Sequence, residues 1–177
     1  MAVGVFGGAF DPPHNGHVAL AQTAMERLEL ESLHVTVVVA PGHKETVAPA
    51  EARLELARLA FAGLGTVEPE LYEYTVDALE AHGYEDPVFL IGADELVDFP
   101  TWKQPERVLE LARLGVATRP GYRAEATSPR IEIFELEPYP VTSSEIRDRV
   151  GSGESIDGLV PDAVARRIAE LGLYRDA

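Results

Sequence analysis

Two histidines and several glycines lie close together near the start of the chain, in the stretch Gly7-Gly8-Ala9-Phe10-Asp11-Pro12-Pro13-His14-Asn15-Gly16-His17. An apolar run, Val3–Phe6, precedes this stretch, and a helical pattern follows it. A strand, a glycine turn and a helix start in this order present backbone N–H groups to an anion, and glycine lets a phosphate approach the backbone. His14 and His17 fall on one side of the first helical turn, where imidazoles can donate hydrogen bonds to phosphate oxygens. The stretch therefore predicts a nucleotide phosphate site with a histidine pair.

A zinc site is the alternative for the histidine pair, because histidines three residues apart can share a metal ion. Asp94 or His43 would then complete the ligand set. The chain contains no HExxH motif and no cysteine, so no protein metal site is predicted. The absence of cysteine also excludes disulfides and thiolate nucleophiles.

The bulk composition indicates one domain, residues 1–177, of an ordinary globular protein. Fifteen basic against 30 acidic residues give a net charge of −15, which argues against a nucleic-acid-binding surface. An anionic substrate would need local donors, so the only two lysines, Lys44 and Lys103, become informative. No apolar run approaches the roughly 20 residues of a membrane helix, and the chain enters its first strand without a signal peptide. A cytoplasmic location is expected, and no motif indicates an oligomeric state.

Strands and helices alternate along the whole chain. Strands are expected at Val3–Phe6, His34–Ala40, Val67–Leu71, Pro87–Ile91, Leu114–Thr118 and Ile131–Leu136. Helices are expected at Gly16–Glu29, Glu51–Ala62, Thr75–His82 and Pro105–Arg113, then from Thr142 onward and at Pro161–Leu171. Pro69 interrupts the third strand, and Trp102 is expected in a loop. The alternation predicts an α/β protein with a Rossmann-like, doubly wound parallel sheet and helices on both faces.

Four polar or glycine-rich clusters each follow a predicted strand: Gly7-Gly8, Gly92-Ala93-Asp94, Arg119 and Thr142–Ser144. In open α/β sheets, ligands bind outside the carboxyl ends of the strands, so the four clusters should face one crevice. The last cluster also opens a helix, with Thr142 as its cap and Glu145 reaching back to complete a capping box. Together the clusters predict a nucleotide-binding cleft.

The familiar phosphate motifs are absent. The chain has no G-x-x-x-x-G-K-[ST] motif, which argues against a P-loop enzyme. It also lacks a G-x-G-x-x-G motif after the first strand, which argues against a dinucleotide dehydrogenase. Instead, the stretch from Gly7 to His17 resembles the signature of the HxGH nucleotidyltransferases, and Thr142-Ser143-Ser144-Glu145-Ile146-Arg147 is similar to their second phosphate motif. Further motifs resemble the bacterial nicotinate-nucleotide adenylyltransferases, namely Leu90–Asp94, Pro100–Trp102, Arg119–Tyr122 and Leu171–Tyr174. The resemblance runs from Val3 to Arg175.

This resemblance implies transfer of the adenylyl group of ATP to nicotinate mononucleotide, with Mg²⁺ carried by ATP and no covalent enzyme intermediate. It gives His14, His17 and Arg147 catalytic roles: the histidines contact the ATP phosphates, and Arg147 holds the leaving pyrophosphate. ATP binding is implied for Gly7, Gly8, Phe10, His14, His17, Gly92, Asp94, Arg119, Ser143, Ser144 and Arg147. Acceptor binding is implied for Lys44, Tyr74, Thr75 and Trp102, with the indole stacked on the nicotinate ring.

The chain departs from the family pattern at three positions: Gly42 replaces a proline, Glu73 a serine and Thr142 a serine. Nicotinamide mononucleotide or phosphopantetheine is the alternative acceptor, and a non-catalytic nucleotide sensor is the alternative class.

Several of these residues also have purely structural interpretations. Thr142–Glu145 could serve only as a helix cap, and Asp94 could cap the short helix that follows it. Arg147 could pair on the surface with Asp148 or Glu145. Trp102 could belong to the core, and Lys44 could be a solvated loop lysine.

Overall fold

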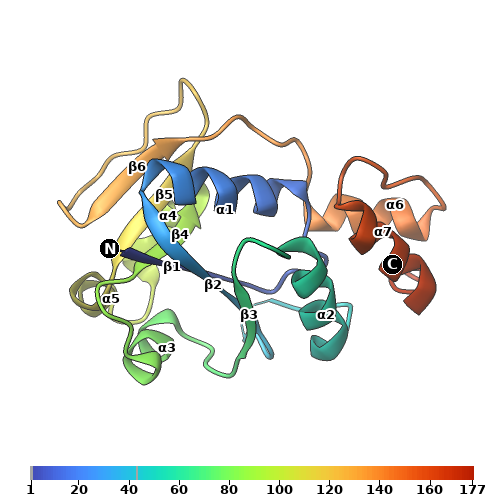
Figure 1. The fold of residues 1–177 in the computed structure, drawn as a ribbon, viewed down its shortest axis with the longest axis horizontal. Coiled ribbons are helices and arrows are strands. Elements are labelled where there is room, and N and C mark those ends of the chain that lie inside the picture. The colour runs from blue at the N-terminus through green and yellow to red at the C-terminus, as the bar shows by residue number, and fades with distance from the viewer. Residues whose placement is uncertain (1, 43) are drawn as a thin grey trace.

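A computed structural model describes residues 2–42 and 44–177, so His43 lies outside the described residues. Six parallel strands form one sheet in the order β3-β2-β1-β4-β5-β6 (Figure 1). Their bounds are β1 Ala2–Gly8, β2 Leu30–Val38, β3 Thr66–Glu70, β4 Val88–Gly92, β5 Arg113–Thr118 and β6 Ile131–Glu135. This order is the one in which doubly wound sheets bind nucleotides, so the predicted fold class is confirmed.

The interrupted third strand is real and lies at an edge of the sheet. Pro69 of β3 aligns with Val37 of β2. Proline lacks a backbone N–H, and an edge strand tolerates it because its outer side has no partner. The second strand is longer than expected, since it begins at Leu30 rather than His34.

Helices cover both faces of the sheet, and each face has its own core. The helices are α1 Asn15–Arg27, α2 Ala50–Ala60, α3 Thr75–His82, α4 Ala93–Asp98, α5 Pro105–Leu111, α6 Ser143–Gly151 and α7 Asp162–Leu171, with a 3₁₀ turn η1 at Phe99–Thr101. Residues of α1, α2, α6 and α7 share one core with β1 and β2, around Val35, Leu56 and Phe61. Residues of α3 and α5 share the other with β4 and β5, around Ile91 and Leu114.

The loop expected before Trp102 is mostly helical. The short helix considered after Asp94 is α4, but no bounds were predicted for it or for η1, because six and three residues are too few for a helical period to show, and α4 buries no side chain. Trp102 follows η1 directly.

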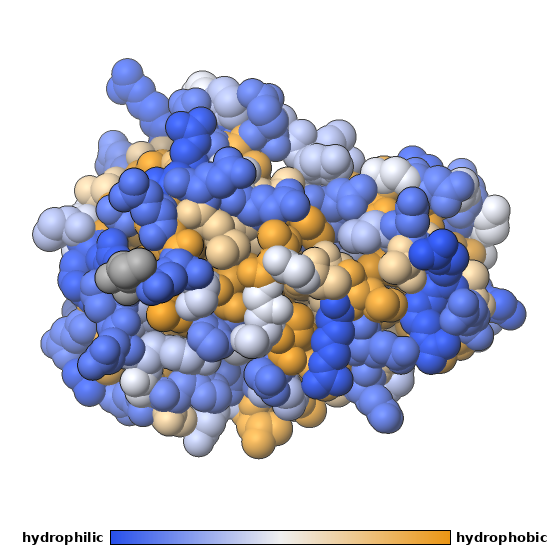
Figure 2. Space-filling model, in the orientation of Figure 1, coloured by the Kyte–Doolittle hydropathy of each residue, from blue (hydrophilic) through white to orange (hydrophobic). Residues whose placement is uncertain are grey.

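The molecular surface agrees with the acidic composition. Figure 2 shows mainly hydrophilic residues on the displayed face, with apolar residues gathered across its middle. Within the described residues, none of the helices combines the length and the apolar character that crossing a membrane requires.

Candidate active site

His14 and His17 cap the start of α1 in a reciprocal arrangement. Nδ1 of His14 accepts hydrogen bonds from the backbone N–H of Gly16 at 3.0 Å and of His17 at 3.4 Å. Nδ1 of His17 accepts from the backbone N–H of His14 at 3.0 Å. The two rings stack with their centroids 3.7 Å apart. The pair thus satisfies backbone donors that a helix start leaves without partners.

Gly16 makes this arrangement possible. A Cβ at Gly16 would lie 2.9 Å from atoms of the His14 ring, closer than real contacts allow. The glycine between the histidines is therefore required by the ring that folds back over the helix start.

The reciprocal cap determines which ring nitrogen can donate. A nitrogen that accepts a hydrogen bond carries no proton, so each neutral ring holds its proton on Nε2. Burial lowers the pKa of His14 to about 4. Burial, followed by the neighbouring charges of His14 and Lys44, lowers the pKa of His17 well below its ordinary value. At neutral pH the site presents two Nε2–H donors that point away from the helix backbone.

The segment Ala9–Pro13, here called the phosphate turn, is held by packing as well as by hydrogen bonds. The Phe10 ring lies edge-on to Phe61 and to His17, with centroids 5.4 Å and 5.1 Å away. A Cβ at Gly8 would come within 3.2 Å of the Phe10 ring. A side chain at Gly8 would therefore press on the Phe10 ring, so Phe10 packing is a second constraint on this position beside the predicted approach of a phosphate.

The second phosphate motif is bonded to the phosphate turn. Thr142 caps α6 by accepting from the Glu145 N–H at 3.1 Å. Ser143 Oγ donates to the Pro12 carbonyl at 2.9 Å. Arg147 Nη1 donates to the Asp11 carbonyl at 2.8 Å. Two motifs more than 130 positions apart in the chain thus form one site.

Two details of α6 differ from expectation. Glu145 does not complete a capping box, because its carboxylate accepts from Arg149 at 3.4 Å instead. Surface pairing of Arg147 with Asp148 or Glu145 is also wrong. Its guanidinium donates instead to Asp11 and, at 3.1 Å, to Ser144 Oγ.

A cavity of about 520 Å³ lies at the carboxyl ends of β4 and β5. It is lined by Leu20, Gly92, Ala93, Asp94, Glu95, Ala117, Thr118, Arg119, Tyr122, Leu136, Pro138 and Tyr139. Gly92, Asp94 and Arg119 were predicted for this crevice. Asp94 is not the cap of α4, since Gly92 holds that position and Asp94 lies in the first turn.

The cavity adjoins the histidine pair. A Cβ at Gly16 would lie 3.4 Å from Tyr139, which lines the cavity. Leu20, another lining residue, comes three positions after His17 on α1, so both lie on one helix face. A nucleotide whose base occupies the cavity can therefore reach the histidines with its phosphates.

Sequence reasoning missed the apolar lining residues Leu20, Tyr122, Leu136, Pro138 and Tyr139. The Arg119 guanidinium lies 5.5 Å from the centre of the Tyr122 ring, a cation–π contact at the rim. Two signals could have found part of the set: the helical spacing of Leu20 from His17, and Tyr139 between two prolines after the last strand.

Three of the four residues expected to bind the acceptor, Tyr74, Thr75 and Trp102, lie at the start of α3 and after η1. Tyr74 is the N-cap of α3, and its side chain makes no cap hydrogen bond to the first N–H groups of the helix, which begin with Thr75. Lys103 Nζ lies 4.9 Å above the Tyr74 ring. Lys44 is exposed, yet its charge acts on His17, so it lies toward the phosphate site.

Trp102 belongs partly to the core. The half-buried indole lies edge-on to Phe99 and Phe89, with centroids 5.2 Å and 6.2 Å away. Phe89 in turn lies 3.5 Å from where a Cβ at Gly7 would stand. The core interpretation is therefore right for part of Trp102, and the residue as a whole is only partly buried.

Two of the departures from the family pattern contact each other. A side chain at Gly42 would collide with the Glu73 carboxylate. The missing side chain at position 42 thus makes room for the larger residue at position 73.

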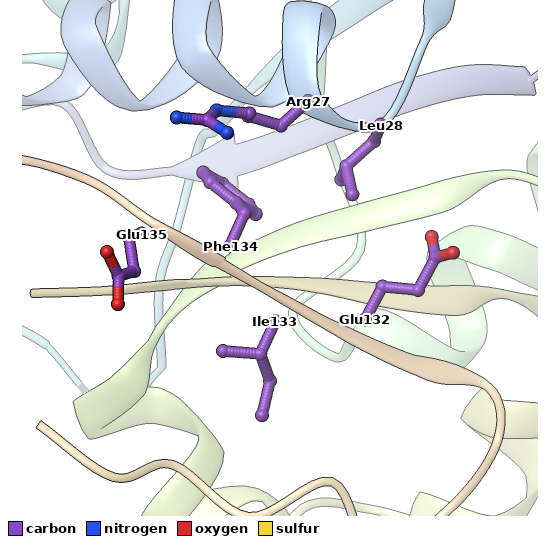
Figure 3. A pocket seen from close by; sticks show the side chains of 6 residues that line it. All are labelled: Arg27, Leu28, Glu132, Ile133, Phe134 and Glu135. Carbon is purple, nitrogen blue, oxygen red and sulfur yellow. The ribbon is translucent and has the colours of Figure 1, made fainter. Parts of the chain in front are cut away.

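Another hollow, of about 490 Å³, lies between the end of α1 and the edge strand β6 (Figure 3). Glu132 and Glu135 lie apart along the strand, and Arg27 reaches in from the helix. None of the predicted site residues lines it. Among residues 2–42 and 44–177, no three histidine or carboxylate side chains gather as metal ligands would.

The order of the strands, the cavity at their carboxyl ends and the histidine pair beside it are those of a nucleotide-binding α/β protein. The family model described as cytidylyltransferase-like matches residues 5–149. A Thermus thermophilus protein named "Probable nicotinate-nucleotide adenylyltransferase" is 42% identical over 99% of this chain and 100% of its own length. A protein of the same name from Bordetella avium is 36% identical over 99% of this chain and 98% of its own length. The chain belongs to the nicotinate-nucleotide adenylyltransferase family, a family of nucleotidyltransferases.

Solved structures confirm the fold. Plasmodium falciparum nicotinic acid mononucleotide adenylyltransferase complexed with NaAD superposes with a TM-score of 0.79 at 15% identity, covering 99% of this chain and 98% of that one. The same enzyme complexed with APC gives a TM-score of 0.77.

Proposed function

We propose that the protein transfers the adenylyl group of ATP to nicotinate mononucleotide, forming nicotinate adenine dinucleotide and pyrophosphate. The observation that carries this proposal is the reciprocal histidine cap, which aims two neutral Nε2–H donors from one helix start. The cavity beside the pair accommodates the adenosine end of ATP, and Arg147 brings a guanidinium to the phosphate turn. Relatives named for the same reaction support the proposal.

The chemistry needs no side-chain nucleophile. An oxygen of the acceptor phosphate attacks the α-phosphorus of ATP and forms a new P–O bond. The bond from the α-phosphorus to the bridging oxygen breaks, and pyrophosphate leaves with the electron pair. The Nε2–H groups of His14 and His17 stabilise charge on the α-phosphate, and Arg147 neutralises the departing pyrophosphate.

Mg²⁺ enters with ATP in this proposal and neutralises charge on its phosphate oxygens. Lys44, Arg119 and Arg147 around the cleft are donors to phosphate rather than metal ligands. The ion would be held by the triphosphate and water.

The start of α3 supports nicotinate as the acceptor. The N–H groups of its first turn, beginning at Thr75, receive no cap from the Tyr74 side chain and suit a carboxylate, because charged acceptors make short, strong bonds to backbone donors. A carboxamide would place its NH₂ against some of the same donors and leave them unsatisfied. We expect nicotinate mononucleotide to be preferred over nicotinamide mononucleotide by at least about 30-fold in kcat/KM.

Pyrophosphate release from ATP and Mg²⁺ tests the proposal, with nicotinate mononucleotide, nicotinamide mononucleotide, phosphopantetheine or no acceptor. The expected result is turnover that depends on nicotinate mononucleotide and yields the dinucleotide. ATP binding without pyrophosphate release would instead identify a sensor. Equal kcat/KM for the two pyridine nucleotides would show that Gly42 and Glu73 have opened the pocket.

A further inference from the structure

The carboxylate of Asp11 joins three parts of the chain. Only 4% of the residue is exposed. Its Oδ2 accepts the N–H of Val47 at 2.7 Å, and its Oδ1 accepts the N–H of Ala48 at 3.1 Å. Oδ1 also accepts the hydroxyl of Tyr174 at 2.7 Å. Asp11 thus connects the phosphate turn to the segment Lys44–Ala48, here called the acceptor-side segment, and to the end of the chain.

Tyr174 is built into this place by the end of α7. Gly172, with a left-handed backbone (φ 65°), terminates the helix, and the N–H of Leu173 donates to the Ile168 carbonyl at 3.1 Å. Such a Schellman turn redirects the chain sharply. Tyr174 then lies 4% exposed, with its hydroxyl at Asp11.

Positive groups surround the pair. Arg53 is 1% exposed and donates to the carbonyls of Ala9 and Ala48, at 2.9 Å and 3.1 Å. It therefore ties the same two segments that Asp11 joins. Burial, and then the hydrogen bond to Asp11, raise the pKa of Tyr174, while Arg147 and Arg53 act in the opposite direction. The hydroxyl keeps its proton and remains a donor.

We propose that Asp11 and Tyr174 are positioning residues, which fix the acceptor-side segment against the phosphate turn so that Lys44 and the histidine pair face one cleft. This inference rests on the proposed function for its kinetic consequence. The adenylyl transfer requires its two anionic reactants to be aligned. In this proposal, ATP is bound at the phosphate turn and the acceptor mononucleotide at the acceptor-side segment. Without the Tyr174 hydroxyl, the Asp11 carboxylate keeps the two backbone donors of Val47 and Ala48 but loses its only side-chain donor among the described residues. The carboxylate is then held less firmly, and the two segments shift relative to each other.

The kinetic test compares Tyr174→Phe with the full-length wild type. We expect kcat to fall about 10-fold, since small misplacements of bound reactants cost this much or more, with KM for ATP changed less than about 2-fold. Asp11→Asn should lower kcat further, because it also disturbs the bonds to Val47 and Ala48.

A stability-matched control separates positioning from folding. Ile168→Val trims a buried side chain of the same helix, α7, without touching Asp11. Assayed well below its melting temperature, this variant should keep the wild-type kcat. If Tyr174→Phe and Ile168→Val lose the same activity for the same loss of melting temperature, the role of Tyr174 is only structural and the inference is wrong.

Amide hydrogen exchange provides a test that does not depend on turnover. In Tyr174→Phe, the amides of Val47 and Ala48 should exchange at least about 5-fold faster, while that of Val116 in β5 stays unchanged. Unchanged exchange at Val47 and Ala48 would overturn the inference even in an active enzyme. A wild type that releases no pyrophosphate would overturn the proposed function, and the exchange result would still decide whether Tyr174 holds the acceptor-side segment.

Discussion

Folding stability should depend on pH through His14, because the capping role of this side chain requires the neutral ring. The pKa is 6.5 in the unfolded chain and about 4 in the folded protein. A depressed folded pKa contributes stability above pH 6.5, and this stability is lost as the pH falls toward 4. By pH 5 the unfolded chain carries nearly one proton at this position, of which about 0.7 is taken up below pH 7, whereas the folded protein remains almost unprotonated there. The linkage corresponds to about 2 kcal/mol of unfolding free energy.

Urea unfolding of the wild type and His14→Asn at both pH values measures this effect. Asparagine is a strong N-cap that does not titrate, so His14→Asn keeps a cap on α1 and removes the linked proton. The wild type should lose about 2 kcal/mol more than His14→Asn over this interval. Titrating carboxylates contribute equally to both proteins and cancel in the comparison.

Thr142→Ala is the control, since it removes the cap of α6, and the capping group, the Thr142 hydroxyl, does not titrate in this pH range. It should cost about 1 kcal/mol at both pH values. An equal pH dependence of the unfolding free energy in the wild type and His14→Asn would refute the reasoning. His14 would then bind a proton as readily in the folded protein as in the unfolded chain, so it could not act as a neutral cap.

Three further outcomes are expected. His17→Ala should reduce turnover by about 10² or more while circular dichroism shows the fold retained, and near-normal turnover would restrict His17 to packing. Saturating nicotinate mononucleotide should change the emission of Trp102, the only tryptophan, more than ATP alone does; an indole that does not respond to the acceptor belongs to the core alone. Arg53→Leu should lower the urea-measured unfolding free energy by at least about 3 kcal/mol, because the buried guanidinium donates to four carbonyls, those of Ala9, Val38, Val39 and the buried Ala48, which would lose this donor. A loss under about 1 kcal/mol would mean that water replaces the guanidinium.

Hydrophobic patterning alone determined the six strands and the longer helices, since burial on both faces of a parallel sheet imposes apolar runs that a single sequence reveals. The spacing of the His14–His17 motif and the serines after Thr142 likewise sufficed to predict a phosphate site and the family. The bounds of short elements such as α4 could not be predicted, because a six-residue helix with no buried side chain leaves no periodic signal.

The contacts that assemble the site were decided only by the tertiary structure. The hydroxyl of Tyr174 meets Asp11 across 163 positions of sequence, and no local pattern encodes a contact of that range. The lining of the cavity by Leu20 and Tyr139 depends in the same way on which strands become neighbours. Gly8 shows the difference: the sequence suggested a backbone open to phosphate, whereas the structure shows that a side chain at this position would press on the ring of Phe10. Residue types and their spacing indicate which chemistry a segment can perform. The contacts that require a particular residue at a position become visible only in the folded structure.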